Sequence, residues 1–159
     1  MKRKTTTMML LTVLVSVIAL YSVDANRCRE CMKISVTSDN PFMEMIMQSM
    51  FDSMSNPNCE SNPNSVTTTD CGNMKCGTID AQMDLSIETM TGDTVGMNMN
   101  MLVRGCMDND GTFNNANGCH DVADVEDAIV ASMELGEEAT LNDISGDYCV
   151  CDSNNCNTD

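Results

Sequence analysis

The chain has 159 residues with no tryptophan, two tyrosines and three phenylalanines, which predicts one small domain with a modest apolar core. Eight Lys or Arg stand against 24 Asp or Glu, a formal net charge of −16. Such an acidic surface repels phosphate backbones and anionic lipid headgroups, which argues against nucleic-acid binding and against membrane lysis by a cationic face. A basic partner stays open, although an acidic surface that only keeps the protein soluble is favoured.

The first 25 residues have the pattern of a cleaved signal peptide. Three basic residues at positions 2–4 precede an apolar run from residue 8 to about residue 21, and Val23-Asp24-Ala25 offers small residues for cleavage. The run is shorter than the roughly 20 residues of a membrane-spanning helix, so a retained signal anchor is disfavoured. Cleavage would remove three positive charges and one negative charge, leaving one domain over residues 26–159 with a net charge of −18.

A short amphipathic helix is predicted over residues 41–54. Ser38-Asp39-Asn40-Pro41 is typical of a helix start, with a capping side chain and a proline in the first turn. Asn56-Pro57 ends the helix, and the polar stretch up to Asp70 is expected to be a loop. Apolar residues recur at helical spacing in this segment: Phe42, Met43, Ile46, Met47, Met50 and Met54.

The residues from Gly77 to Cys106 predict a long β-hairpin. Apolar and polar residues alternate over 79–88 and again over 95–103, which is typical of half-buried strands. Thr91-Gly92-Asp93 supplies the turn. Hairpin tips are exposed and this one has no disulfide constraint, so Thr91, Gly92 and Asp93 are a candidate contact surface for a partner.

A second helix is predicted after Cys119, ending at Gly136. Its apolar residues are three or four positions apart, and acidic residues in its opening turns suit the positive end of the helix dipole. The apolar residues are Val122, Val125, Ile129 and Met133, and the acidic ones are Asp121, Asp124, Glu126 and Asp127.

Methionine is unusually common in the first helix and in the hairpin strands. Because its side chain is flexible and polarizable, methionine can form an adaptable binding surface or fill a core that is poor in aromatic residues. The spacing matches the periodicity of burial, so the core interpretation is favoured, and both can hold in part. These residues are Met43, Met45, Met47, Met50, Met54, Met83, Met97, Met99 and Met101.

Candidates for catalysis are few. His120 is the only histidine, and Cys119-His120-Asp121 resembles the His-Asp step of secreted phospholipases A2. Those enzymes have a cysteine pair ahead of the histidine and a glycine-rich calcium loop, and neither is present in this sequence. A solvated or helix-capping His120 is therefore favoured over a catalytic one.

Two further motifs suggest metal or redox chemistry. Asp108-Asn109-Asp110-Gly111 resembles part of a calcium loop, but its register would place Asn117 where a bidentate Glu is required, so an acidic turn is favoured. Cys28-x-x-Cys31 suggests zinc or redox work, yet ten cysteines behind a signal peptide favour a structural role. We expect no catalytic residue, no metal site and no cofactor.

The ten cysteines imply disulfides in an oxidising compartment, and the sequence alone cannot choose their connectivity. Their order nevertheless resembles the urokinase-receptor and lymphocyte-antigen three-finger domains over nearly the whole of residues 26–159. One departure is Val150 between Cys149 and Cys151, where that superfamily usually has adjacent cysteines. The Cys-x-Cys-x4-Cys-Asn ending is more similar to the ET module of secreted nematode proteins. The motifs are Cys28-x-x-Cys31, Cys71-x4-Cys76, Arg104-Gly105-Cys106 after the hairpin, and Cys151-x4-Cys156-Asn157.

The resemblance implies a small disulfide-rich, mainly β fold that is three-finger-like, with one or two short helices. The Met-rich helix would lie in finger one, the hairpin in finger two and the acidic helix in finger three. Three-finger relatives are ligands, receptor ectodomains, toxins or channel modulators, and almost none are enzymes. The implied pairing joins Cys28 to Cys76, Cys31 to Cys59, Cys71 to Cys106, Cys119 to Cys149, and Cys151 to Cys156.

We expect a secreted, non-enzymatic binding module that is a ligand or modulator of an extracellular or cell-surface protein, monomeric and not inserted in the membrane after signal cleavage. The alternatives are a small secreted hydrolase built around His120 and nearby acids, and a structural or storage extracellular protein. The sequence stops at Asp159, three residues past Cys156, without the hydrophobic tail that a lipid anchor requires, so free secretion is expected.

Overall fold

The structure is a computed structural model that describes residues 26–89, 91–107, 113, 116–132 and 139–158. The expected signal peptide over residues 1–25 lies outside the described residues. So do the calcium-loop fragment at 108–111, Met133, and Gly136, the expected end of the second helix.

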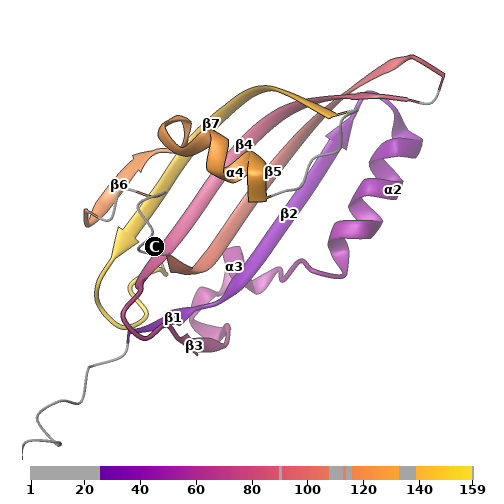
Figure 1. Cartoon of the computed structure of the whole chain (residues 1–159). Helices are drawn as coiled ribbons and strands as arrows, with labels where there is room; N and C mark the ends of the chain where they lie inside the picture. Colours follow the sequence, from indigo (N-terminus) through magenta and orange to yellow (C-terminus); the bar gives the residue numbers. More distant parts are fainter. Residues whose placement is uncertain (1–25, 90, 108–112, 114–115, 133–138, 159) are drawn as a thin grey trace, which may run out of the picture.

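A five-stranded antiparallel sheet forms most of the molecule (Figure 1). Two short strands, β1 (Arg27–Arg29) and β3 (Thr68–Asp70), pair separately. The central hairpin of β4 and β5 is the one predicted from the sequence, and the mainly β fold class is confirmed. The five strands stand in the order β2 (Cys31–Ser38), β5 (Thr94–Met107), β4 (Lys75–Glu88), β7 (Ala139–Cys151) and β6 (Gly118–Asp121).

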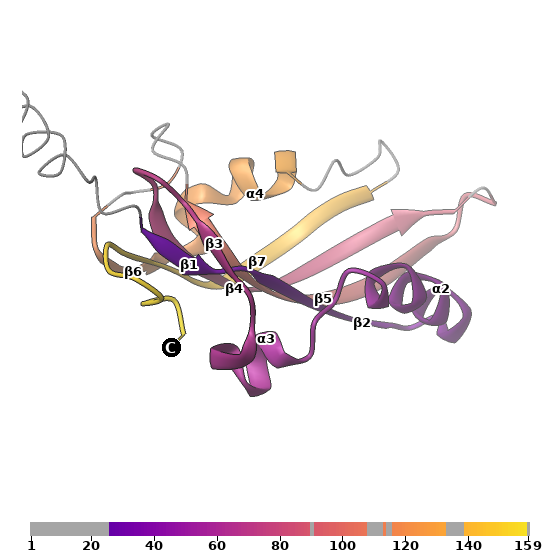
Figure 2. The ribbon, with the colours of Figure 1, turned by 90° about the horizontal axis from the view of Figure 1, so that it is seen from below.

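The core lies on one face of this sheet. Because side chains alternate between the faces of a strand, every second residue of β4 and β5 points to this face. Met83 and Met97 are fully buried there, and the ring of Tyr148 from β7 joins them. Val122, Val125 and Ile129 cover the core from η2 (Val122–Val125) and α4 (Glu126–Ser132), and Figure 2 shows α4 over this face.

The first helix, α2 (Pro41–Asp52), begins as predicted. The Asn40 side chain accepts hydrogen bonds from the backbone N–H groups of Phe42 and Met43, and Pro41 occupies the first turn. The helix ends two residues before its predicted end. In Figures 1 and 2 it lies beside β2, the edge strand of the sheet.

The prediction of a loop between α2 and Asp70 is wrong in part. This stretch contains α3 (Asn58–Ser61), η1 (Pro63–Ser65) and the strand β3. Pro57 precedes α3 and Pro63 opens η1, because a proline suits the first turn of a helix as well as a loop. Buried Cys59 fixes α3 to the sheet through its disulfide with β2.

Five disulfides use all ten cysteines. Three of them gather at the end of the molecule that holds β1, β3 and the last residues of the chain, and we call these three the disulfide knot: Cys28–Cys76, Cys71–Cys106 and Cys151–Cys156. The other two bonds are Cys31–Cys59 and Cys119–Cys149. The five pairs coincide with those that the three-finger resemblance implies.

Two buried polar side chains fasten the chain around the disulfide knot. The guanidinium of Arg104 donates to the carbonyl oxygens of Cys59 and Asn157 and to the Thr78 hydroxyl. The Asn157 side chain accepts from the N–H of Arg29 and donates to the carbonyl oxygens of Arg29 and Gly77. The Cys-Asn ending seen in the sequence therefore holds the C-terminal residues against β1 and β4.

Candidate functional site

His120 is placed as a packing residue rather than as a helix cap. Its ring stacks on Tyr148 with 5.1 Å between ring centroids, and its Nε2 lies 3.0 Å from the carbonyl oxygen of Ala116. The cap of η2 is Asp121 instead, whose side chain accepts from the Ala123 N–H. His120 and Asp121 are successive strand residues, so their side chains leave the backbone in opposite directions and do not form a His-Asp pair.

The cysteines of the Cys28-x-x-Cys31 motif belong to two different disulfides, with Cys76 and with Cys59. Among the described residues, one group of three metal-ligand atoms lies within 4.8 Å of one another, and it consists of Cys28, Cys71 and Cys106. All three are disulfide-bonded, so they hold two touching disulfides rather than thiolates for a metal.

The hairpin tip is exposed and polar, as predicted for Thr91, Gly92 and Asp93. The Gly92 N–H donates to the Thr89 carbonyl oxygen, the Thr89 N–H donates to that of Asp93, and Gly92 has a φ of +81°. The Thr91 hydroxyl donates to the Asp93 carboxylate. The described tip residues are thus joined by hydrogen bonds and offer a few polar atoms and one charge to a partner.

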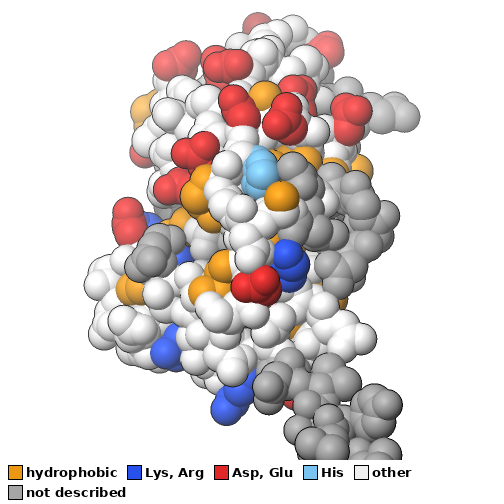
Figure 3. Space-filling view, turned by 90° about the vertical axis from the view of Figure 1, so that its left-hand side faces the viewer, with side chains coloured by type: hydrophobic (Ala, Val, Ile, Leu, Met, Phe, Trp, Pro, Cys, Tyr) orange, Lys and Arg blue, Asp and Glu red, His pale blue; other side chains and the backbone are white. Residues whose placement is uncertain are grey.

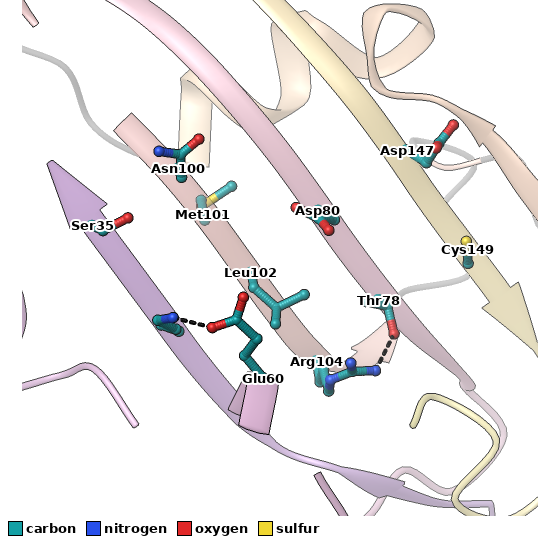
Figure 4. A pocket seen from close by; sticks show the side chains of 11 residues that line it. Ser35, Glu60, Thr78, Asp80, Asn100, Met101, Leu102, Arg104, Asp147 and Cys149 are labelled. Atoms are coloured by element: carbon teal, nitrogen blue, oxygen red, sulfur yellow. Dashed lines mark hydrogen bonds and ion pairs between the residues drawn. The ribbon is translucent and has the colours of Figure 1, made fainter. Parts of the chain in front are cut away.

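A hollow of about 550 Å³ lies on the face of the sheet away from the core (Figure 4). Lys33 at its rim pairs with Glu60 of α3, and Arg104 is occupied by its own hydrogen bonds. Asp80 and Asp147 oppose each other across β4 and β7, which places like charges together. The chain's one histidine is not in the lining, so no hydroxyl there meets an imidazole base.

The most distinctive surface lies on α2. The large hydrophobic side chains that are exposed among the described residues all belong to this helix and the turn after it. Four of them follow one another at intervals of four residues and so form a line along the helix, and Met45 lies beside this line. We call this set the apolar stripe, and its members with their exposed fractions are Phe42 (64%), Met45 (61%), Ile46 (37%), Met50 (59%) and Met54 (54%).

The opposite side of α2 closes the free edge of β2. The side chains of Glu44 and Gln48, and that of Ser55 just after the helix, accept hydrogen bonds from the backbone N–H groups of β2 at this edge. Met47 and Phe51 pack against the core from the same side. An uncovered strand edge invites pairing with other chains, so α2 protects the sheet while it turns its apolar stripe to solvent.

Charge is divided between the two ends of the molecule. The Lys and Arg residues of the described part lie at the end with the disulfide knot: Arg27, Arg29, Lys33, Lys75 and Arg104. Figure 3 shows acidic side chains crowding the upper part of one face, with the basic ones below. The end of the sheet that carries the start of α2 and the hairpin tip therefore presents carboxylates without cations beside them.

The methionines of the hairpin strands are buried, whereas those of the predicted first helix are divided between the core and the exposed surface. Met83, Met97, Met99 and Met101 are buried, which confirms the core interpretation for the hairpin. The helix methionines divide, because Met47 packs on the core while three others lie in the apolar stripe. Sequence periodicity showed that α2 has an apolar side but could not show whether anything covers it.

Among the described residues, no helix is long and apolar enough to cross a membrane. No protein family matches this chain, and neither a curated protein nor a solved structure does.

Proposed function

We propose that this protein is a secreted, non-enzymatic binding module that acts as a ligand or modulator of an extracellular or cell-surface protein. One observation carries the proposal: the exposed large hydrophobic side chains of the described residues are concentrated in the apolar stripe on α2. Single exposed hydrophobic residues are ordinary, but a contiguous apolar surface is typical of an interaction site.

Secretion is supported by the five disulfides, because such bonds persist in oxidising compartments, and by the signal-like pattern of the first 25 residues. Membership of the ET-module or three-finger proteins stays a proposal. It is supported by the cysteine pairing and by the central β4–β5 hairpin, which would be finger two.

A binding function is favoured over a hydrolase by the contacts of the candidate residue. His120 stacks on Tyr148, and the neighbouring Asp121 caps η2, so neither is held for proton transfer to a substrate. His120→Ala is expected to leave partner binding within about twofold of wild type.

The test is a pull-down from extracellular fluid and from membrane extract with the disulfide-bonded protein as bait. A Met45→Gln/Met50→Gln variant keeps side-chain length and helix propensity but makes the stripe polar. A Gln82→Ala/Asn98→Ala variant alters exposed sheet positions instead and is the control. We expect a saturable partner that the control retains and the stripe variant loses. Self-association alone, or equal capture by both variants, would contradict the proposal.

A further inference from the structure

We propose that the apolar stripe on α2 docks on a protein partner whose own apolar surface is bordered by Lys and Arg side chains. This rests on the proposed binding function and adds the chemistry of the partner. It is argued from the way α2 is held, from the residues it exposes and from the charges around it.

The helix is fixed before any partner arrives. The Asn40 side chain caps its first turn, and Glu44 and Gln48 bind backbone N–H groups of β2 at 2.9 Å each. After the helix, the Asn56 N–H donates to the Met32 carbonyl oxygen at 2.7 Å. A partner therefore meets a preformed surface, which lowers the entropy cost of association.

The side chains of the stripe are suited to a protein surface. Three of its five members are methionines, which adapt their shape to an apolar neighbour, and Phe42 supplies one large ring. Ser49 and Ser53 lie on the same side of the helix and are exposed, so a partner can approach the backbone there closely. An amphipathic helix presented in this way is a known mode of recognition by an apolar groove.

The acidic residues around the stripe favour a partner with basic residues at the border of its apolar surface. From Ile34 to Met74 the sequence contains no Lys or Arg. Asp52 and Asp39 are exposed at the two ends of the helix, and no described Lys or Arg forms an ion pair with either. Carboxylates beside an apolar contact favour a partner with cations at its rim. The acidic residues in this segment are Asp39, Glu44, Asp52, Glu60 and Asp70.

Two other binding partners for the apolar stripe, a second copy of the chain and a lipid surface, fit less well. A second copy would bring two stripes together with their flanking carboxylates and no cation between them, within a pair of secreted chains that would each carry −18. A lipid surface is usually bound by helices with Lys or Arg on the polar face, and α2 has neither.

The test measures binding of two fluorescent amphipathic peptides of about five helical turns, with identical leucine faces and a polar face of either Lys or Glu. The full chain is produced in a secretory host so that its disulfides form. We expect the Lys peptide to bind saturably, the Glu peptide to bind at least about tenfold more weakly, and Met45→Gln/Met50→Gln to lower affinity for the Lys peptide about tenfold.

Matched charge variants separate local from overall electrostatics. Asp39→Asn/Asp52→Asn removes two carboxylates beside the stripe, and Asp84→Asn/Asp143→Asn removes two that face each other on the sheet. Only the first pair of substitutions is expected to lower the affinity for the Lys peptide by more than about threefold. Equal weakening by both pairs would mean that the overall charge, not the border of the stripe, selects the peptide, and would overturn the inference.

The remaining outcomes distinguish the two proposals. Equal binding of both peptides overturns the basic border but leaves the stripe as a binding surface. Partner capture that is insensitive to the stripe variant overturns both. Sedimentation equilibrium that finds a dimer lost in Met45→Gln/Met50→Gln assigns the stripe to a second copy, and co-sedimentation with phosphatidylcholine vesicles assigns it to lipid, so either result overturns the inference.

Discussion

At the scale of single residues, the buried amide of Asn157 fixes the segment that follows the last disulfide. The side chain of Asn157 is 3% exposed and uses three hydrogen bonds to hold the last residues against β1 and β4. The amide is needed for this arrangement, because it accepts from one backbone group and donates to two others.

Asn157→Asp is expected to lower the free energy of unfolding by about 1–3 kcal/mol, because a carboxylate would face the carbonyl oxygens of Arg29 and Gly77 without a donor. Denaturant unfolding without reductant measures this. Asn154→Asp is the control, since Asn154 only accepts from the Arg27 N–H and is exposed. Equal loss in both variants would contradict the role given to the Asn157 amide.

Gly146 is required by a close approach of two strands. Its φ is +125°, and a Cβ atom built there would lie 2.1 Å from the carbonyl oxygen of Asp80. Gly146→Ala is therefore expected to destabilise the protein by more than about 1 kcal/mol in the same unfolding experiment. Gly105→Ala is the control, because a Cβ at Gly105 meets nothing within 4 Å. A Gly146 variant as stable as the Gly105 variant would refute this.

At the scale of the elements, methionine serves two purposes. Met83 in β4 is fully buried, whereas Met45 in α2 is 61% exposed. Met83→Ala is expected to cost about 2–5 kcal/mol by leaving a cavity, and Met45→Ala to change stability by no more than about 0.5 kcal/mol. Thermal and denaturant unfolding compare the two. A large cost at Met45 would mean that the stripe is part of the core.

The sequence predicted the regular elements better than the interrupted ones. The β4–β5 hairpin and the start of α2 followed from alternation and from the Asn40-Pro41 cap. β7 was missed because its pairing with β4 shifts at Asp84/Leu85, and a shift of one residue breaks the period of two. β2 was also missed, although Met32, Ile34 and Val36 alternate with polar residues and could have been recognised.

The candidate site could be predicted only in part from the sequence. The hairpin tip was predicted to be exposed because it is a turn, and it is. The apolar residues of α2 were readable too, but their exposure depends on where the helix docks. α2 lies along a sheet edge and contacts it through Glu44 and Gln48, helped by Ser55 after the helix, so the apolar stripe is left uncovered. Tertiary placement, not periodicity, decides that outcome.

At the scale of the whole molecule, covalent bonds supplement a small core. Each disulfide contributes about 2–4 kcal/mol by constraining the unfolded chain, and three of them form the knot that joins both ends of the domain. Full reduction is expected to abolish the folded state at room temperature. Circular dichroism with and without reductant measures this, and a reduced protein with an unchanged near-ultraviolet spectrum would contradict it.

The pairing of the cysteines illustrates the limit of spacing alone. Ten cysteines permit many connectivities, and the pairing came from resemblance to three-finger domains rather than from the residues themselves. The resemblance did not predict that the apolar stripe, which lies between Cys31 and Cys59, is exposed.

The central claim is that the apolar stripe contacts a protein partner, and site-specific photo-crosslinking tests it most directly. A benzophenone side chain is placed at Met45 in the stripe or, as a control, at Gln82 on the exposed sheet face, and each protein is irradiated in extracellular fluid and with membrane extract. We predict one discrete, saturable adduct from position 45 and none from position 82. The same adducts from both positions, or no adduct from position 45, would contradict the account.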